Sequence, residues 1–239
     1  METVLVLNPA LNVADLSRRY RAAGRVVVNG FLSPKSADVL AQYLSGTPPW
    51  LHLLNSGDKV FEIPKASYLA MPDAERIKLQ DAVNVAARDG FQYRYDSIRV
   101  SDNIGDREAS NTPLDQFATL MCAAGTIALL KAITGHRDIN FADAQATAYN
   151  PGDFLTGHDD NIAGKGRRAA YVLGLTPAWR TEWGGLLLFH QNEHVEGFVP
   201  GFNRLALFSV PQRHSVSLVT HSAGTPRYSI TGWLRSIQE

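Results

Sequence analysis

Three residues whose side chains bind metal ions stand in the C-terminal half of the chain. His158 and Asp160 are two positions apart, and in an extended strand residues i and i+2 point to the same face. An imidazole and a carboxylate placed in this way can reach one ion. A histidine from a different strand would complete a site of two histidines and one carboxylate, which leaves positions on an octahedral iron open for other ligands. His214 is the predicted third ligand.

Two other pairs have similar spacing. His136 and Asp138 follow a predicted helix end at Gly135 and no strand pattern surrounds them, which indicates a surface turn. His194 and Glu196 lie in a polar connection between two predicted strands, where solvated charge is the ordinary explanation and contact with a substrate is the other. Because chance alone produces such short pairs, the predicted metal site needs support from its surroundings.

Strand-like runs separated by turn residues follow residue 144 and contain the predicted ligands. The N-terminal half instead favours helices over residues 34–44, 72–88 and 114–134, the first of which has Ser33 as N-cap before Pro34. Strands are also predicted there, over residues 25–29 and 91–100, and the polar segment 101–113 is interpreted as a loop that forms a substrate lid. The six runs of the C-terminal half are QATAY, AAYVLGL, GGLLLF, RLALFSV, HSVSLV and RYSITGWL.

This organisation predicts a mainly β protein with a helical layer. The expected fold is a double-stranded β-helix, or jelly-roll, with the N-terminal helices packed on its outside. The periodicity changes near residue 140 without a linker, so residues 1–239 are expected to form a single domain. Within it, residues 1–140 form a supporting region and residues 141–236 form the catalytic core.

Composition excludes several classes of protein. Lysine and arginine balance aspartate and glutamate at 23 each, and the pI is about 7.1, so no basic field is available to hold nucleic acid. No apolar run approaches the roughly 20 residues that cross a bilayer. The first residues lack the features of a signal peptide, and a cytoplasmic location is expected. Cys122 is the only cysteine, which excludes an intramolecular disulfide and a thiolate-cluster zinc site.

The segment around the predicted ligands, YNPGDFLTGHDDNIAGKGRR, resembles the iron-binding segment of the prolyl 4-hydroxylase-like Fe(II)/2-oxoglutarate oxygenases. In that family a tyrosine and a turn precede the HxD motif, and a basic residue, an apolar strand and a Gly-Gly strand follow. The segments NRLALFSVPQRHSVSLV and PRYSITGWL are similar to the strands that carry the distal histidine and the co-substrate arginine. The resemblance covers residues 144–235, with a looser likeness in GRVVVNGFLSPKSADVL and FQYRYD.

The resemblance implies a second site beside the metal. Arg227 and Thr231 match the residues that hold the distal carboxylate of 2-oxoglutarate, and Tyr149 matches a tyrosine near the metal-bound end of this co-substrate. An arginine pairs with a carboxylate through two hydrogen bonds, and on an extended strand Arg227 shares its face with Thr231. Tyr149 has an alternative interpretation as a core aromatic. A second co-substrate tyrosine of the oxygen-sensing prolyl hydroxylases aligns with Gly174, which leaves open how the distal carboxylate is held.

The implied reaction is hydroxylation of an unactivated C–H bond, coupled to conversion of 2-oxoglutarate and O2 to succinate and CO2. Related halogenases have a small residue where this chain has Asp160, so hydroxylation is expected. Arg168, Trp183 and His190 are candidate substrate contacts, each with an equally plain interpretation as a structural or surface residue. The cofactors expected are Fe(II), 2-oxoglutarate and O2, with ascorbate left open.

The substrate that the resemblance favours is a prolyl residue in a protein or peptide. A free amino acid or small metabolite is the alternative within the same chemistry. A cupin-type protein that binds Fe, Mn or Zn through the same barrel is a further alternative, because metal identity is not encoded in two histidines and an aspartate. A catalytically silent jelly-roll that binds a partner is the alternative of another class. Oligomeric state stays open, a homodimer included.

Overall fold

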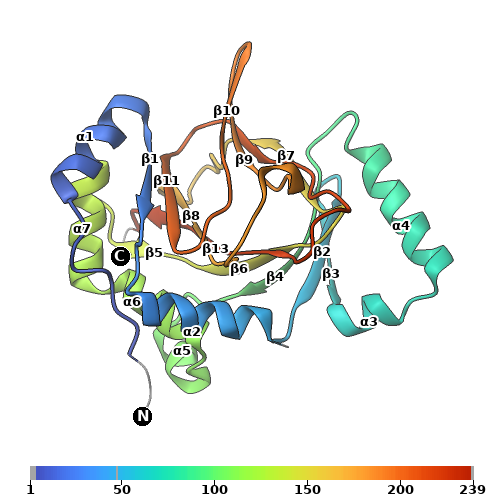
Figure 1. Ribbon diagram of the computed structural model, residues 1–239, viewed down its shortest axis with the longest axis horizontal. Coiled ribbons are helices and arrows are strands. Elements are labelled where there is room, and N and C mark those ends of the chain that lie inside the picture. The colour runs from blue at the N-terminus through green and yellow to red at the C-terminus, as the bar shows by residue number, and fades with distance from the viewer. Residues whose placement is uncertain (1–3, 47, 238–239) are drawn as a thin grey trace.

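The computed structural model describes residues 4–46 and 48–237. Most of its strands belong to one large antiparallel sheet that curls into a half-barrel, with helices on the outside (Figure 1). The fold prediction of a jelly-roll with a helical layer is therefore confirmed. The strands are β1 Arg25–Asn29, β2 Leu51–Ser56, β3 Lys59–Pro64, β4 Tyr93–Arg99, β5 Phe141–Ala142, β6 Gln145–Tyr149, β7 Phe154–His158, β8 Arg167–Gly174, β9 Leu187–Gln191, β10 His194–Phe198, β11 Arg204–Ser209, β12 His214–Val216 and β13 Arg227–Arg235.

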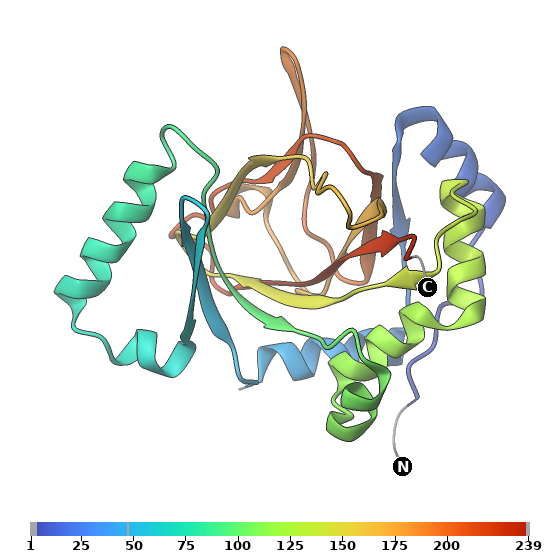
Figure 2. The same ribbon diagram turned by 180° about the vertical axis from the view of Figure 1, so that it is seen from behind.

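The order of strands in the sheet is β1-β11-β8-β13-β6-β4-β7-β12-β9-β10. Residues from β6, β7, β8, β9, β12 and β13 line one cavity. The sheet therefore bends so that β7, β9 and β12 face β6, β8 and β13. The β9–β10 hairpin projects from the barrel in both views (Figure 2). The segment 194–196, predicted as a connection, is thus part of a strand, and Glu196 pairs with Arg25 of β1.

Strand β13 shows how sequence alternation produces the two faces of the sheet. Arg227, Thr231 and Trp233 line the interior cavity, while Ile230 and Leu234 are fully buried in the main core outside it. In a strand, successive side chains point to opposite faces. The predicted sharing of one face by Arg227 and Thr231 is therefore confirmed.

The main hydrophobic core lies between the outer face of the sheet and the helices. Leu40, Phe117 and Leu130 of three different helices pack there with Leu173 and Ile230 of the sheet. Burial of apolar side chains on both layers is what holds such an arrangement together. The helices are α1 Val13–Ala23, α2 Pro34–Ser45, α3 Lys65–Ala70, α4 Asp73–Ala86, α5 Ile104–Ser110, α6 Pro113–Cys122 and α7 Ala124–Thr134, with a short 3-10 turn at Thr181–Trp183.

The N-cap of α2 follows the prediction, since the Ser33 side chain accepts a hydrogen bond from the Ser36 amide and Pro34 opens the helix. The single helix predicted over residues 114–134 is wrong. The chain breaks at Ala123, which is extended (φ −62°, ψ 142°), so that α6 and α7 meet at a bend of 62°. Among the described residues no single helix is long and apolar enough to cross a membrane, and only this bent pair together reaches that length and composition.

The segment 101–113 is not the predicted loop. Residues 104–110 form α5, whose N-cap Asn103 accepts hydrogen bonds from the amides of Gly105 and Asp106. This helix packs on α6, and none of the residues from 101 to 113 lines the cavity inside the sheet. The structure gives no support to a lid in this segment.

The change of pattern near residue 140 does not divide the sheet. Strand β1 pairs with β11, and β4 pairs with both β6 and β7. The N-terminal half therefore supplies strands to the same sheet as well as the outer helices, and β4 reaches the wall of the cavity.

Candidate metal centre

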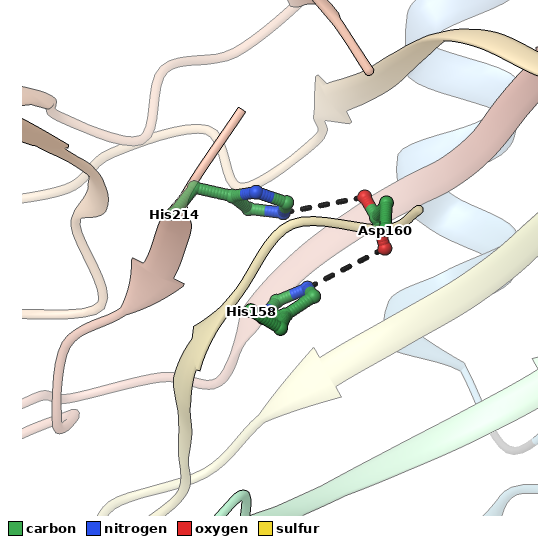
Figure 3. A group of neighbouring side chains, drawn as sticks. All are labelled: His158, Asp160 and His214. Atoms are coloured by element: carbon green, nitrogen blue, oxygen red, sulfur yellow. Dashed lines mark ion pairs between the residues drawn. The ribbon is translucent and has the colours of Figure 1, made fainter. Parts of the chain in front are cut away.

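His158, Asp160 and His214 lie together at one end of the cavity (Figure 3). His158 is the last residue of β7 and His214 is the first of β12, and the two are direct partners in the antiparallel ladder. Asp160 lies beyond the end of β7 in a left-handed conformation with φ 63°. The expectation that one extended strand presents both His158 and Asp160 is wrong, because the turn after the strand brings the carboxylate back toward the two rings.

The three side chains converge on one point. The Asp160 Oδ1 atom is 3.5 Å from His158 Nε2, and its Oδ2 atom is 3.4 Å from His214 Nε2. One nitrogen or oxygen from each residue lies within 4.8 Å of the others. The group is shielded from solvent, with side-chain exposures of 18% for His158, 8% for Asp160 and 6% for His214.

Backbone contacts orient both rings for metal binding. His158 Nδ1 is 3.0 Å from the Thr156 carbonyl and His214 Nδ1 is 2.8 Å from the Gln212 carbonyl. A carbonyl only accepts, so each Nδ1 carries the proton and each Nε2 presents a lone pair to the cluster. Burial, with the nearby His158 ring, lowers the pKa of His214 to about 4. His214 is therefore present at pH 7 as the neutral imidazole that a metal requires.

This donor set fits a divalent transition metal. Two imidazole nitrogens and one carboxylate oxygen on one side of an ion leave the remaining positions open. The cavity of about 450 Å³ next to the cluster supplies space for ligands at those positions. The arrangement therefore suits a metal that works on bound molecules better than one that only stabilises the fold.

Arg227 forms part of the wall of the same cavity, and its positive charge has no counterpart nearby in the described part of the chain. Only 3% of the residue is exposed, and its Nε atom is buried without a hydrogen-bond partner. Within residues 4–46 and 48–237, no carboxylate lies within ion-pair distance of its guanidinium. Burial lowers the pKa of Arg227, but an arginine stays protonated in proteins. A buried cation without an internal partner points to an anionic ligand.

The surroundings of Arg227 fit such a ligand. Thr231 and Tyr149 also line the cavity, and the Arg227 guanidinium lies 5.2 Å from the centre of the Tyr149 ring. Burial, together with the nearby Tyr95, raises the pKa of Tyr149 well above its ordinary value, so its hydroxyl stays protonated and can donate a hydrogen bond. Gly185, with φ 62°, makes room for the arginine, because a Cβ there would lie 3.0 Å from Arg227 Cδ.

Comparison with known proteins places the cluster and Arg227 inside one family match. Residues 144–235 match the family model of the 2OG-Fe(II) oxygenase superfamily. This part of the chain, which holds the metal cluster and Arg227, is therefore similar to that superfamily. The mouse prolyl 3-hydroxylase OGFOD1 is 38% identical over 100 residues, which are 38% of this chain and 18% of that protein. The aligned segment thus spans less than a fifth of this curated relative.

Solved structures of other proteins share the fold. A Pseudomonas putida prolyl-4-hydroxylase has a TM-score of 0.59 at 18% sequence identity, with 95% of this chain and 100% of that chain covered. A Trichoplax adhaerens prolyl hydroxylase in complex with a peptide of the hypoxia inducible factor oxygen degradation domain has a TM-score of 0.60 at 19% identity, with 94% and 89% covered. Both confirm the jelly-roll architecture, which in this chain positions the metal cluster and Arg227.

The three candidate substrate contacts lie outside the cavity that holds the metal cluster. Arg168 is 40% exposed and its Nε donates to the Asp138 carboxylate at 2.7 Å. Trp183 packs edge-on against Trp179, and His190 Nε2 lies 2.8 Å from Ser215 Oγ. Their roles toward a substrate stay predictions, without support from the cavity that holds the metal cluster.

The neighbouring residue Arg167 occupies the place expected of Arg168. It lines the cavity, donates to the Asp160 carbonyl at 3.1 Å and lies 3.5 Å from the centre of the Trp233 ring. Phe91, Tyr93 and Tyr95 also line the cavity and were not singled out. Their alternation in FQYRYD was the available signal, because it puts three aromatic side chains on one face.

Gly174 lies away from the metal cluster, at the end of β8. A Cβ at this position would be 2.4 Å from the Gly201 carbonyl oxygen, so the backbone leaves no room for the tyrosine of the oxygen-sensing enzymes. Tyr171 does not replace it, because its hydroxyl donates to the Asp143 carbonyl and its ring packs near Phe117 in the outer core.

Proposed function

We propose that this protein is an Fe(II)- and 2-oxoglutarate-dependent dioxygenase that hydroxylates a prolyl residue in a protein or peptide. The observation that carries the proposal is the presence, in one cavity, of an open cluster of two histidines and an aspartate and of a buried arginine without an internal partner. The cluster suits iron, and the arginine suits the distal carboxylate of a dicarboxylate co-substrate.

The residues have distinct tasks in this proposal. His158, Asp160 and His214 hold Fe(II) through two Nε2 atoms and a carboxylate oxygen. Arg227 pairs with the distal carboxylate of 2-oxoglutarate, Thr231 adds a hydroxyl beside it, and Tyr149 donates a hydrogen bond. When bound, Fe(II) and 2-oxoglutarate activate O2 for attack on a C–H bond, with succinate and CO2 as co-products.

The protein around the site excludes water and fixes orientation. Leu155, Leu187 and Val216 contribute apolar side chains to the cavity wall, which strengthens the electrostatic attraction between Arg227 and a carboxylate. The backbone contacts of the two histidines hold their lone pairs in place before a metal arrives. Ligand geometry, a dry pocket and a fixed cation are the contributions that the chain itself makes.

The prolyl substrate is supported by similarity and not by the site alone. The mouse prolyl 3-hydroxylase OGFOD1 is 38% identical over 100 residues, and two structural neighbours are prolyl hydroxylases. A free amino acid or small metabolite is the second candidate within the same reaction. A silent binding module is disfavoured by the retention of all three metal ligands and Arg227.

Succinate formation tests the reaction. The purified chain is supplied with Fe(II), 2-oxoglutarate, ascorbate and air, with and without proline-containing peptides, and is compared with H158A and R227A. We expect succinate from the parent, none from H158A, and turnover by R227A only at much higher co-substrate concentration. R168A serves as the matched control, because it removes an arginine outside the cavity.

The outcomes separate reaction from substrate. Succinate without hydroxyproline in any peptide supports the oxygenase and points to a small-molecule substrate. Absence of binding of both Fe(II) and 2-oxoglutarate by the parent contradicts the proposed function.

A further inference from the structure

Four aromatic side chains form a continuous row along one wall of the cavity. Phe91 lies two residues before β4, Tyr93 and Tyr95 are the first and third residues of that strand, and Tyr149 continues the row on β6. The distances between neighbouring ring centres are 5.6, 5.4 and 5.0 Å. All four residues, called the aromatic row below, line the cavity. Their spacing is that of favourable aromatic pairs.

The aromatic row leads from solvent to both halves of the site. Phe91 at its outer end is 49% exposed, and Tyr149 at its inner end is 3% exposed. The Phe91 ring centre is 5.5 Å from that of His158, and Tyr149 lies beneath the Arg227 guanidinium. A molecule that enters beside Phe91 therefore meets an apolar surface until it reaches the metal cluster.

The exposed end of the row is held firmly in place. The Phe91 carbonyl accepts from Asn55 Nδ2 at 3.0 Å, and the Tyr93 amide donates to Asn55 Oδ1 at 2.9 Å. Between them, the Gln92 amide donates to Thr156 Oγ1 at 2.8 Å. Asn55 is itself only 4% exposed. Because the backbone around Phe91 is already fixed, binding of a ligand there requires no further ordering of this backbone.

The aromatic row does not contribute a charge to a ligand. The cation near the metal cluster comes instead from β8, where Arg167 stacks on Trp233 and donates to the Asp160 carbonyl. Phe91 and Tyr93 therefore suit an uncharged ring with polarised C–H bonds, which aromatic faces attract. Neither side chain carries a positive charge that would pair with the carboxylate of a free amino acid.

We propose that Phe91 and Tyr93 are specificity-determining residues that bind the pyrrolidine ring of a peptidyl proline and deliver it to the metal cluster. The inference rests on the proposed function, since it names the surface that the prolyl substrate contacts. Tyr95 and Tyr149, deeper in the row, lie beside the co-substrate pocket and are not part of this surface.

Two pools of short randomised peptides test the inference. One pool has a fixed central proline and the other a fixed central alanine, so no target sequence has to be known. The full chain, loaded with Zn(II) in place of Fe(II) and with 2-oxoglutarate, is immobilised, and the ratio of retained proline pool to alanine pool is measured. We expect the parent to prefer the proline pool and F91A to lower this preference about five- to tenfold.

Matched variants and a second readout separate binding from folding. I104A removes a side chain that is 57% exposed on α5, outside the cavity, and is expected to retain the proline preference. F91A is expected to bind Zn(II) and 2-oxoglutarate as the parent does, because the carbonyls of Thr156 and Gln212, and not the Phe91 ring, orient the two histidines. F91L retains an apolar side chain and is expected to fall between parent and F91A.

The contrary results are distinct. Equal retention of both pools by the parent, or an unchanged preference in F91A, overturns the inference while the oxygenase proposal stands. A parent chain that takes up neither metal nor 2-oxoglutarate overturns the proposed function itself, and this is measured before peptide is added.

Discussion

Two arginines are buried to nearly the same extent in this protein, Arg94 at 5% and Arg227 at 3% exposure, and their surroundings differ. The Arg94 Nε donates to the Asp153 carboxylate at 2.8 Å, and its guanidinium also bonds to the Gly152 carbonyl. Arg227 has no carboxylate partner among the described residues. The charge of Arg94 is neutralised inside the chain, whereas the charge of Arg227, which lines the cavity, is available to an anionic ligand.

The region around Arg94 is a polar network that joins several elements. Asn150 donates to both Asp153 and Asp96, and Asp96 also pairs with His52 at 2.8 Å and with Lys65 at 2.6 Å. The network connects β2, α3 and β4 to the turn between β6 and β7, which contains Asn150 and Asp153. Although burial raises the pKa of Asp96, the hydrogen bond from His52 and the charge of Lys65 lower it overall. Every charge in this region has its counterpart inside the chain.

The largest expected effect comes from breaking the balance around Arg94. D153A leaves this guanidinium buried without its carboxylate, and loss of one partner of a buried pair costs about 3–5 kcal/mol of unfolding free energy. Urea denaturation followed by circular dichroism measures the change. D138A removes an exposed partner of Arg168 and is expected to change stability by less than about 1 kcal/mol. Equal effects of the two variants would contradict the comparison.

The second prediction concerns Arg227, where loss of the charged side chain is expected to reduce ligand affinity and not stability. R227M replaces an unbalanced buried cation with an apolar side chain, so the free energy of unfolding is expected to stay level or rise. Affinity for 2-oxoglutarate is expected to fall about a hundredfold, because two charge-assisted hydrogen bonds are lost. Calorimetric titration with Zn(II) present measures the affinity, and urea denaturation the stability. Destabilisation as large as that of D153A would show that Arg227 has an internal role.

A smaller effect concerns acidity at the metal cluster. Burial and the nearby His158 lower the pKa of His214 from 6.5 to about 4, so between these values the unfolded chain binds a proton that the folded chain does not. Stability therefore falls as pH falls through this window, by about 2 kcal/mol between pH 7 and pH 5 for this residue. Urea denaturation of the metal-free chain at the two pH values measures the loss. H214N is expected to lack this component, and an identical pH dependence in parent and variant would exclude it.

The sequence predicted the site best where residue types that bind a metal or an anion recur at the two-residue spacing of a strand. His158, Asp160 and His214 could be selected because ligand types recur in a known spacing, and the shared face of Arg227 and Thr231 followed from alternation along β13. The same alternation explains the confusion of Arg168 with Arg167, since a shift of one residue in a strand moves a side chain to the other face. Only the actual register of β8 decides between them.

Contacts between distant segments were beyond such reasoning. No residue near His52 in the sequence has the spacing of a partner, yet His52 is a buried residue of β2, and the pairing of β2 with β4 brings Asp96 to it. Ala123 and its two neighbours are neither proline nor glycine, and Gly125 is already inside α7, so the sequence does not mark the break clearly. Both features depend on tertiary packing, which overrides local propensity.

The pairing of β1 with β11 has a consequence for how the chain folds. Strand β1 ends at Asn29, and its partner β11 begins at Arg204, so most of the polypeptide lies between the two strands. Closing so long a loop costs entropy before any contact compensates for it. Val26 and Val28, which are buried in the finished protein, stay without their strand partner until β11 has been synthesised. We therefore expect β1 to dock late, and the nascent chain to depend on its helices to cover this apolar strand meanwhile.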